Sequence, residues 1–264
     1  MKYFEGKTIW ITGASSGIGE HLALALAPYA QALILSARNT NALERVKTNC
    51  SACENVLVLP FDLSDGAATE QAVSQAFSSF SRVDILFNNG GISQRASAMD
   101  TDEQVERQLF QINYFSNVRL SKLVARKMAE AGGGHLVITS SLLGKWGFHL
   151  RSTYAATKHA LHGFYDSMRL EMEQHGMVIT LILPGFIRTD ISKHAVDGSG
   201  QLTGEMDPNQ AGGISPEECA KRILKGVAKQ LPEFGVGGKE LNGLWLRRFF
   251  PNFFHRILQK KSAR

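Results

Sequence analysis

Residues 7–27, KTIWITGASSGIGEHLALALA, carry the strongest indication of the fold. This stretch begins with an apolar, β-branched run, continues through a turn that holds Gly13, Gly17 and Gly19, and ends in a leucine- and alanine-rich run typical of a helix. Glycine lets a backbone pass close to a phosphate, and the amino end of the following helix offers free N–H groups and the positive end of its dipole. The order strand, glycine turn, helix therefore predicts a nucleotide-binding unit.

The same alternation continues along the chain. Five further apolar runs have the character of strands, LILSAR, VLVLPF, DILFNN, HLVITSS and VITLILP, and segments of helical length separate them; EFGVGG is one more short candidate. Strands that crossover helices bury on both faces are continuously apolar, as these are. We therefore predict an α/β fold, a Rossmann-like, doubly wound three-layer sandwich around a mainly parallel sheet of about seven strands.

The chain is long enough to bury one large core. It has 264 residues, of which 44% are hydrophobic and 20% charged, and we expect a single domain over residues 1–238. Residues 197–213 are rich in glycine and weakly patterned, which indicates either a mobile lid or a disordered loop. The run SPEECAKRILKGV then predicts a helix with Ser215 as its N-cap and Pro216 as its first residue.

Residues 239–264 form a tail of different composition. They contain seven basic residues against Glu240 alone, a charge of +6, and the whole chain carries +5, so the remainder is close to −1. The tail also holds leucines and aromatic residues at steps of four, and Pro251 should kink or divide it. Two interpretations stay open: a helix packed on the domain or on a second subunit, or peripheral contact with an anionic membrane. The nearly neutral remainder argues against a nucleic-acid partner.

No apolar run approaches the roughly 20 residues that span a bilayer, and the first strand candidate begins at Lys7, which leaves no room for a leader peptide. Three cysteines, an odd number, do not make a disulfide framework and suit a reducing compartment. We expect a cytoplasmic protein, with membrane association at most at the periphery. Cys50 and Cys53 form a C-x-x-C in a polar loop without further ligands nearby, so we expect no metal site.

The end of the second strand candidate indicates which dinucleotide binds. Dinucleotide folds commonly place an acid about 20 residues past the glycine turn to hold the ribose 2′-hydroxyl, whereas an arginine there accommodates a 2′-phosphate. This chain has Arg38, and no acid before Glu44. We therefore predict NADP(H), with NAD(H) as the alternative; an ordinary solvated strand end is the other interpretation of Arg38. Asp62 is placed either to receive the adenine amino group or to cap a helix.

Further motifs follow in order along the chain. They are NNGG (Asn88–Gly91), Asn113 in QINYFSN, Ser141 in ITSS, Tyr154 and Lys158 in YAATK, and Pro184-Gly185 with Thr189. Together with TGASSGIG, these motifs resemble those of the short-chain dehydrogenase/reductase family of the Y-x-x-x-K type. The resemblance runs from Gly6 to about Gly238. Gly90 departs from it, because the family usually has N-N-A-G. The sequence around Tyr154 is most similar to the membrane-associated branch that acts on steroids, retinoids and related lipids.

The spacing of Tyr154 and Lys158 gives the resemblance a physical meaning. A phenol has a pKa of about 10 and exchanges protons poorly at neutral pH. A lysine four residues later lies on the same helical face, so we expect its charge, with that of the oxidised nicotinamide, to lower the pKa of the phenol. Tyr154 would then be a general acid and base, and Lys158 would also bind the nicotinamide ribose. Either residue alone would more often be a half-buried aromatic or a solvated charge.

The resemblance supplies the remaining roles. Ser141 would hold the substrate oxygen, Asn113 would position a water that links Lys158 to solvent, and residues 191–213 would cover the substrate. The expected coenzyme contacts are Gly13, Ser15, Ser16, Gly17, Ile18, Gly19, Arg38, Asp62, Leu63, Asn89, Tyr154, Lys158, Pro184, Gly185, Ile187 and Thr189.

The predicted activity is hydride transfer between a nicotinamide and a carbonyl compound or secondary alcohol, with an apolar or lipid-like small molecule as substrate. The family also implies a homodimer or homotetramer, formed by the long helices of Asn113 and Tyr154. The alternative function is a catalytically silent dinucleotide-binding sensor or interaction protein. The intact set of Asn113, Ser141, Tyr154 and Lys158 argues against that alternative.

Overall fold

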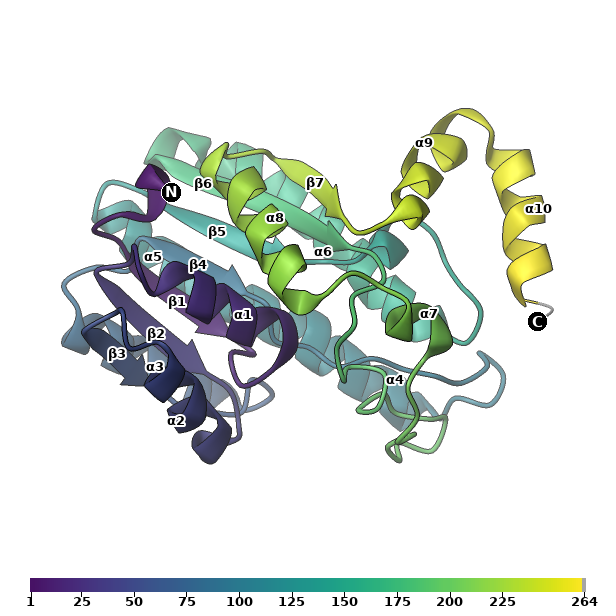
Figure 1. The fold of residues 1–264 in the computed structure, drawn as a ribbon, viewed down its shortest axis with the longest axis horizontal. Coiled ribbons are helices and arrows are strands. Elements are labelled where there is room, and N and C mark those ends of the chain that lie inside the picture. The colour runs from purple at the N-terminus through teal and green to yellow at the C-terminus, as the bar shows by residue number, and fades with distance from the viewer. Residues whose placement is uncertain (263–264) are drawn as a thin grey trace.

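The computed structural model describes residues 1–262, and its centre is a sheet of seven parallel strands in the order β3-β2-β1-β4-β5-β6-β7 (Figure 1). The strands are β1 (Thr8–Thr12), β2 (Ala32–Ser36), β3 (Asn55–Val58), β4 (Ile85–Asn88), β5 (Gly134–Thr139), β6 (Met177–Pro184) and β7 (Glu233–Val236). The predicted parallel α/β sandwich is confirmed. β3 is shorter than its apolar run, and it ends two residues before Pro60, which has no N–H to donate to a sheet.

Helices cover both faces of the sheet. On one face, α1 (Gly17–Leu26), α2 (Thr40–Asn49) and α8 (Pro216–Ala228) pack against the side chains of Ile9 and Leu33. On the other face, α3 (Gly66–Ser79), α5 (Asn117–Glu130) and α6 (Ser152–Met172) pack against Trp10 and Ile34. Neighbouring residues of β1 and β2 thus enter opposite layers, as the period-two geometry of a strand requires. Ser215 caps α8 as predicted, because its Oγ accepts a hydrogen bond from Glu218 N at 3.1 Å.

The helix that carries Asn113 is interrupted. α4 (Glu103–Phe110) begins after Asp102, and a π-helical turn over Gln111–Ser116 joins it to α5. Such turns widen the helix by one residue and are frequent at functional sites. No sequence pattern pointed to this one. Its consequence is that Asn113 projects from a locally altered backbone rather than from a regular helix.

The strand order fixes where a ligand can bind. β1 lies between β2 and β4, so the chain leaves β1 toward one edge of the sheet and later returns to build the other edge. In such sheets the crevice lies beyond the carboxyl ends of the strands at the switch point. Gly13, Asn89 and Ser140 directly follow the ends of β1, β4 and β5. The motifs of the sequence therefore meet at this end of the sheet.

The tail forms two helices, α9 (Asn242–Phe249) and α10 (Pro251–Ser262), which extend from one end of the molecule (Figure 1). Pro251 is the first residue of α10, so the predicted division of the tail at this residue is confirmed. Phe254 is buried and packs edge to face on Trp146, with ring centroids 5.1 Å apart. The last two residues, Ala263 and Arg264, lie outside the described range. Within that range, no helix combines the length and the apolarity that crossing a membrane demands.

The C-x-x-C cysteines lie in the polar loop between α2 and β3, as predicted, but their side chains turn inward. Cys50 and Cys53 are buried in the core below α1 and α2, and burial raises the pKa of the Cys50 thiol to about 11. Thiols in such surroundings stay protonated and unreactive. The described residues contain no group of three or more histidine, cysteine or acidic side chains placed to hold a metal ion.

Candidate active site

The turn after β1 is shaped for close approach of a phosphate. Gly13 and Gly17 have φ angles of +65° and +56°, in the region that side chains disfavour. A Cβ on Gly19 would lie 2.2 Å from the carbonyl oxygen of Gly13, so only glycine fits there. The N-cap residue of α1, Ser16, makes no side-chain capping hydrogen bond. The amino end of α1 and the glycine turn thus form a cradle that fits the pyrophosphate of a dinucleotide.

Hydrogen bonds tie this turn to the end of β4. Thr12 Oγ1 accepts from the backbone N–H groups of Asn89 and Gly90, both at 3.0 Å. The Asn89 side chain donates to Thr12 O at 3.2 Å and accepts from Thr139 Oγ1 at 3.1 Å, which links the ends of three strands. The departure from N-N-A-G also has a local reason. A Cβ on Gly90 would lie 2.5 Å from the Leu63 side chain.

One large cavity, of about 1570 Å³, runs along the carboxyl ends of the strands. It brings together most of the residues predicted to bind coenzyme or substrate. Those that line it are Gly13, Ser15, Ser16, Gly17, Ile18, Arg38, Asp62, Leu63, Asn89, Ser141, Tyr154, Lys158, Pro184, Gly185, Ile187 and Thr189. Gly19 and Asn113 do not line the cavity. Gly19 acts by its close contact with Gly13, and Asn113 lies buried behind the cavity wall.

The first turn of α6 presents Tyr154 and Lys158 to the cavity. Gln94, which is fully buried, accepts hydrogen bonds from Thr153 N and Tyr154 N at 3.0 and 3.2 Å. These bonds satisfy two of the N–H groups that the start of a helix leaves without partners. One turn later, Lys158 Nζ donates to Thr139 O at 2.9 Å and lies 5.7 Å from the centroid of the Tyr154 ring. The two groups therefore share one helical face, as predicted.

Burial is the main influence on the electrostatics of the pair. Burial raises the pKa of Tyr154, while a hydrogen bond with Ser141 and the charge of Arg151 act against this increase. Burial also lowers the pKa of Lys158 to about 8. The amine therefore loses its charge before the phenol ionises. Among the described residues, Arg151 is the cation that acts on the phenol. The expectation that Lys158 and the oxidised nicotinamide together lower the pKa of Tyr154 stays a prediction for the enzyme with its coenzyme.

Three hydrogen bonds hold the side chain of Asn113 in place. Its Oδ1 accepts from Ile92 N at 2.9 Å, and its Nδ2 donates to Ile92 O at 2.9 Å and to Thr157 Oγ1 at 3.2 Å. The amide thus joins the loop after β4 to α6. A Cβ on Gly91 would lie 2.9 Å from Asn113 Oδ1, so glycine is needed at the contact. The water relay through Asn113 stays a prediction.

Arg38 and Asp62 occupy the far end of the cavity. Arg38 is exposed just beyond β2, where a 2′-phosphate would be expected, and its charge contributes to lowering the pKa of Asp62. Burial, the first influence on Asp62, acts in the opposite direction. Asp62 accepts from Ser64 N and Ser64 Oγ at 2.8 Å. It is not a helix cap, since Asp65 is the N-cap of α3.

Sequence reasoning missed two residues that organise this wall. Gln94 caps α6 from a distant loop, and no motif marks it. Arg151 is buried immediately before α6, pairs with Asp207 at 3.0 Å, and also donates to Gln94 O. One signal was available for Arg151. An arginine at the N-cap position of α6, where serine, threonine or aspartate is usual, implies that something other than capping selects it.

Known proteins share both the sequence and the fold. Residues 7–199 match the family model of the short chain dehydrogenases. The human protein called dehydrogenase/reductase SDR family member 7 is 38% identical over 263 residues, which are 97% of this chain and 78% of that protein. A Drosophila melanogaster protein described as dehydrogenase/reductase SDR family protein 7-like is 36% identical over 265 residues, 98% of this chain and 81% of its own.

Solved structures agree with the fold. A short chain dehydrogenase/reductase from Burkholderia phymatum, solved in complex with NAD, superposes with a TM-score of 0.84 and 22% identity over 96% of each chain. A short-chain dehydrogenase from Streptomyces avermitilis gives a TM-score of 0.80 with 24% identity over 98% of each chain. The motif order, the parallel sheet and these similarities lead to one conclusion. The chain belongs to the short-chain dehydrogenase/reductase family of NAD(P)-dependent oxidoreductases.

Proposed function

We propose that the protein is an NADP(H)-dependent reductase of apolar carbonyl compounds. The observation that carries this proposal is the position of Tyr154, Ser141 and Lys158 on the wall of a cavity that also contains the glycine turn. A proton donor, a hydrogen-bonding hydroxyl and a cation thus face the same space as a phosphate cradle. A catalytically silent role is not favoured, since such a protein has no need of this set.

Each side chain has a definite task in this proposal. The glycine turn and α1 hold the pyrophosphate, and Lys158 and the backbone at Pro184 and Gly185 orient the nicotinamide end. When bound, the coenzyme supplies the hydride. Ser141 holds the carbonyl oxygen, and Tyr154 gives that oxygen its phenolic proton as negative charge develops on it. Lys158, which has a pKa of about 8, is mostly protonated at neutral pH and replenishes the proton.

The raised pKa of Tyr154 keeps the phenol in the protonated form that carbonyl reduction uses at neutral pH. A phenol whose pKa lies above its ordinary value is protonated at neutral pH, which is the form that a general acid needs. The reverse reaction needs the phenolate as a base, and burial disfavours that form. We therefore assign the reductive direction to the enzyme in a cytoplasmic setting, where NADPH is the usual electron donor.

The choice of coenzyme rests on Arg38. It has no hydrogen-bond or ion-pair partner of its own among the described residues, and it lines the adenosine end of the cavity. Replacing it by aspartate should reverse the preference, because a carboxylate repels a 2′-phosphate and accepts from a 2′-hydroxyl. With a panel of ketones and aldehydes, we expect the wild type to prefer NADPH and Arg38→Asp to prefer NADH. A wild type that uses NADH better than NADPH would refute the assignment.

The substrate end of the cavity supports an apolar substrate. Trp146 and Phe148 line it from the loop before α6, and Leu246, Phe254 and Ile257 line it from α9 and α10. The tail is thus part of the cavity wall. In this proposal, residues 1–238 form one catalytic domain, residues 191–213 cover the substrate, and residues 239–264 complete its pocket. A hydrocarbon chain in this space would be shielded from water by aromatic and branched side chains.

The outward face of the tail suits the periphery of a membrane. Trp245, Phe249, Phe250 and Phe253 are each more than half exposed, and Arg247 and Arg248 lie among them. Aromatic side chains next to basic ones bind interfaces of anionic lipid. We propose that the tail rests there and admits apolar substrates.

Flotation with anionic liposomes tests the membrane contact. The intact protein should float, while a variant with Trp245, Phe249 and Phe253 changed to serine should not. Met99→Ser is the matched control, since it removes a more exposed apolar side chain, 93% accessible, that is not part of the tail. Flotation is expected to weaken with salt. Equal recovery of the tail variant and the control would exclude a membrane role for the tail.

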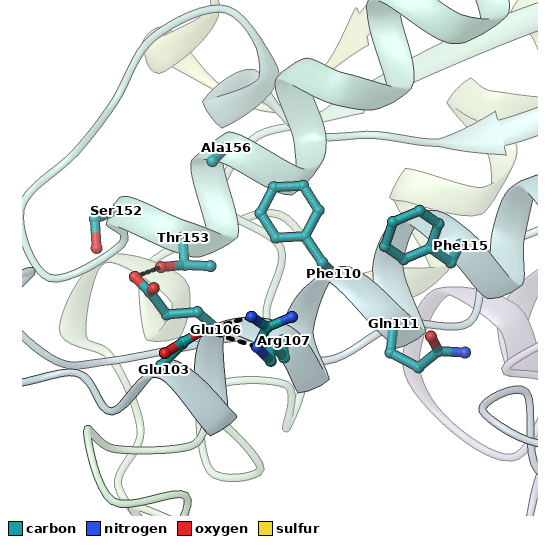
Figure 2. A pocket seen from close by; sticks show the side chains of 9 residues that line it. All are labelled: Glu103, Glu106, Arg107, Phe110, Gln111, Phe115, Ser152, Thr153 and Ala156. Carbon is teal, nitrogen blue, oxygen red and sulfur yellow. Dashed lines mark hydrogen bonds and ion pairs between the residues drawn. The ribbon is translucent and has the colours of Figure 1, made fainter.

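We propose that a second copy of the chain packs against the surface formed by α4, the π-helical turn and α6. A groove of about 640 Å³ lies between α4, the π-helical turn and the start of α6. Phe110 and Phe115 line one side of it, and Ser152, Thr153 and Ala156 the other (Figure 2). Phe115 is 53% exposed, and Leu170 on α6 is 75% exposed. These helices are the ones through which the family is expected to form homodimers or homotetramers. A partner that buries both side chains removes a large apolar area from water.

A further inference from the structure

Arg95 is a cation in the cavity wall that forms no ion pair with any of the described residues. It lies in the loop after β4 and lines the large cavity together with Tyr154 and Arg151. Its backbone is fixed, because Arg95 N donates to Val196 O at 2.8 Å and its neighbour Ala96 N donates to Leu150 O at 3.2 Å. Its Nη1 is buried and has no hydrogen-bond partner in the described part of the chain. A buried guanidinium nitrogen without a hydrogen-bond partner costs free energy unless a ligand accepts its hydrogen bond.

The four carboxylates that line the same cavity are engaged elsewhere. Asp207 pairs with Arg151 at 3.0 Å, and Asp190 pairs with Lys193 at 2.8 Å. Glu240 accepts from the backbone of Phe186 and Gly238, and Asp62 accepts from Ser64. None of these acids forms an ion pair with Arg95. The missing anion must therefore come from outside the described chain.

A second guanidinium group, that of Arg151, lies near Arg95. Burial lowers the pKa of Arg151, Asp207 and Tyr154 raise it, and the charge of Arg95 lowers it further, so the two guanidinium groups lie within electrostatic range of each other. This end of the cavity is not the coenzyme end. The phosphate cradle is at β1 and α1, whereas Arg95 follows β4 beside the segment 191–213 and the first turn of α6. An anion here belongs to the substrate.

We propose that Arg95 binds an acidic group of the substrate, so that the enzyme acts on amphiphilic carbonyl compounds that carry a carboxylate or a similar oxyanion. This inference rests on the proposed reductase function and narrows its substrate class. The hydrocarbon part lies against Trp146, Phe254 and Ile257, and the oxyanion accepts charge-assisted hydrogen bonds from the free edge of the guanidinium. Because a guanidinium offers two parallel N–H groups, it suits a planar carboxylate better than an uncharged ester.

A matched set of substrates tests the proposal. An ω-oxo fatty acid, its methyl ester and the alkanal of equal chain length are reduced with NADPH by wild type, Arg95→Gln and Arg95→Lys. For the wild type we expect kcat/KM to be about tenfold or more higher for the acid than for the ester, the effect of one charge-assisted hydrogen bond. Arg95→Gln should lose this ratio and keep its activity on the ester and the alkanal. Arg95→Lys should keep part of the ratio.

Arg82→Gln is the control, since Arg82 is exposed and pairs with Asp84 at 2.6 Å at the opposite end of β4. Equal kcat/KM for acid and ester in the wild type would overturn the inference while leaving carbonyl reduction intact. If none of the three compounds is reduced, the proposed function fails, and calorimetric binding of the saturated fatty acid and of its alcohol to the wild type decides the inference alone. Tighter binding of the acid supports it, and equal binding overturns it.

Discussion

At the level of single residues, the reactivity of Tyr154 depends on its burial and on the charged groups around it. The phenol is half-buried, its pKa is raised by burial, and Ser141 and Arg151 oppose the increase. Lys158 contributes less positive charge near the phenol than its position suggests, because its own burial lowers its pKa to about 8. We therefore regard Tyr154 as a general acid that is protonated at neutral pH. Lys158 is the group that returns a proton to Tyr154, and its titration limits the pH range in which this happens.

This division of roles predicts the pH dependence of reduction. Below a pH of about 8, Lys158 is charged and donates to Thr139 O; above it the amine is neutral and supplies no proton. We expect kcat for carbonyl reduction to fall as pH rises through about 8. Steady-state assays in buffers of constant ionic strength measure the profile. In Lys158→Arg, whose side chain stays charged, residual activity should not fall until higher pH. A wild-type kcat that is constant to a pH of about 10 would contradict the role of Lys158.

The sequence supported some residues of the site and not others, for a physical reason. Tyr154 and Lys158 are four apart on one helix, so their proximity follows from local geometry alone. Gln94 and Arg151 act through contacts between the loop after β4 and the start of α6. Arg151 donates a hydrogen bond to Gln94 O, and the two residues are 57 positions apart in the sequence. Such contacts depend on tertiary packing and leave no local pattern. The burial that shifts the pKa values of Tyr154 and Lys158 has the same origin.

At the scale of elements, an ion pair attaches the segment 191–213 to the residue that precedes α6. Arg151 directly precedes α6, and Asp207 directly precedes α7 (Pro208–Ala211) within the segment. Their ion pair is largely buried, with side chains 10% and 17% exposed. Asp207 also accepts from Asn209 N and donates its own N–H to Ser192 Oγ at 3.1 Å. This pair therefore connects the proposed cover of the substrate pocket to Arg151, whose charge acts on Tyr154.

Removing the carboxylate should loosen the cover. In Asp207→Asn, Arg151 keeps its burial but loses its ion partner, a change that costs roughly 1–3 kcal/mol of stability for a pair that is not fully buried. We expect faster tryptic cleavage at Lys193 and a raised KM for the carbonyl substrate. Glu205→Gln is the matched control, because it removes one negative charge from an exposed position in the same segment. If both variants are cleaved at the wild-type rate, the ion pair does not hold the segment.

Sequence periodicity was accurate for elements where one rule dominates. Ser215 and Pro216 begin α8, Pro251 divides the tail, and the seven strands follow the apolar runs. It failed where packing decides. The C-x-x-C cysteines turn inward against α1 and α2, and the π-helical turn around Asn113 has no compositional mark. The hydrogen bonds of Asn113 with Ile92 and Thr157 give that turn a structural role.

At the scale of the whole molecule, the outer face of α4 and α6 should pair two copies of the chain. The groove in Figure 2 is flanked by ion pairs and hydrogen bonds, Arg107 with Glu103 and Thr153 with Glu106, and its apolar part is Phe110 and Phe115. We expect Phe115→Arg to convert the dimer or tetramer into smaller species in sedimentation velocity. A charge at that position cannot be buried against a second copy without a partner.

Phe253→Arg serves as the control for this experiment. It places the same charge on a side chain that is 56% exposed, close to the 53% of Phe115, but in the tail. The sedimentation of this variant should be that of the wild type. If Phe115→Arg also leaves the wild-type distribution unchanged, the proposed subunit interface lies elsewhere.

The central claim, that Tyr154 delivers a proton to a carbonyl oxygen while the rest of the cavity holds the coenzyme, is tested most directly by Tyr154→Phe. The change removes one oxygen atom and leaves the ring, so the cavity keeps its shape. We predict that NADPH binding, followed by fluorescence titration, stays within about twofold of the wild type. Carbonyl reduction should fall by about 10²–10⁴-fold, the contribution typical of a general acid. Reduction by Tyr154→Phe at the wild-type rate would contradict the claim.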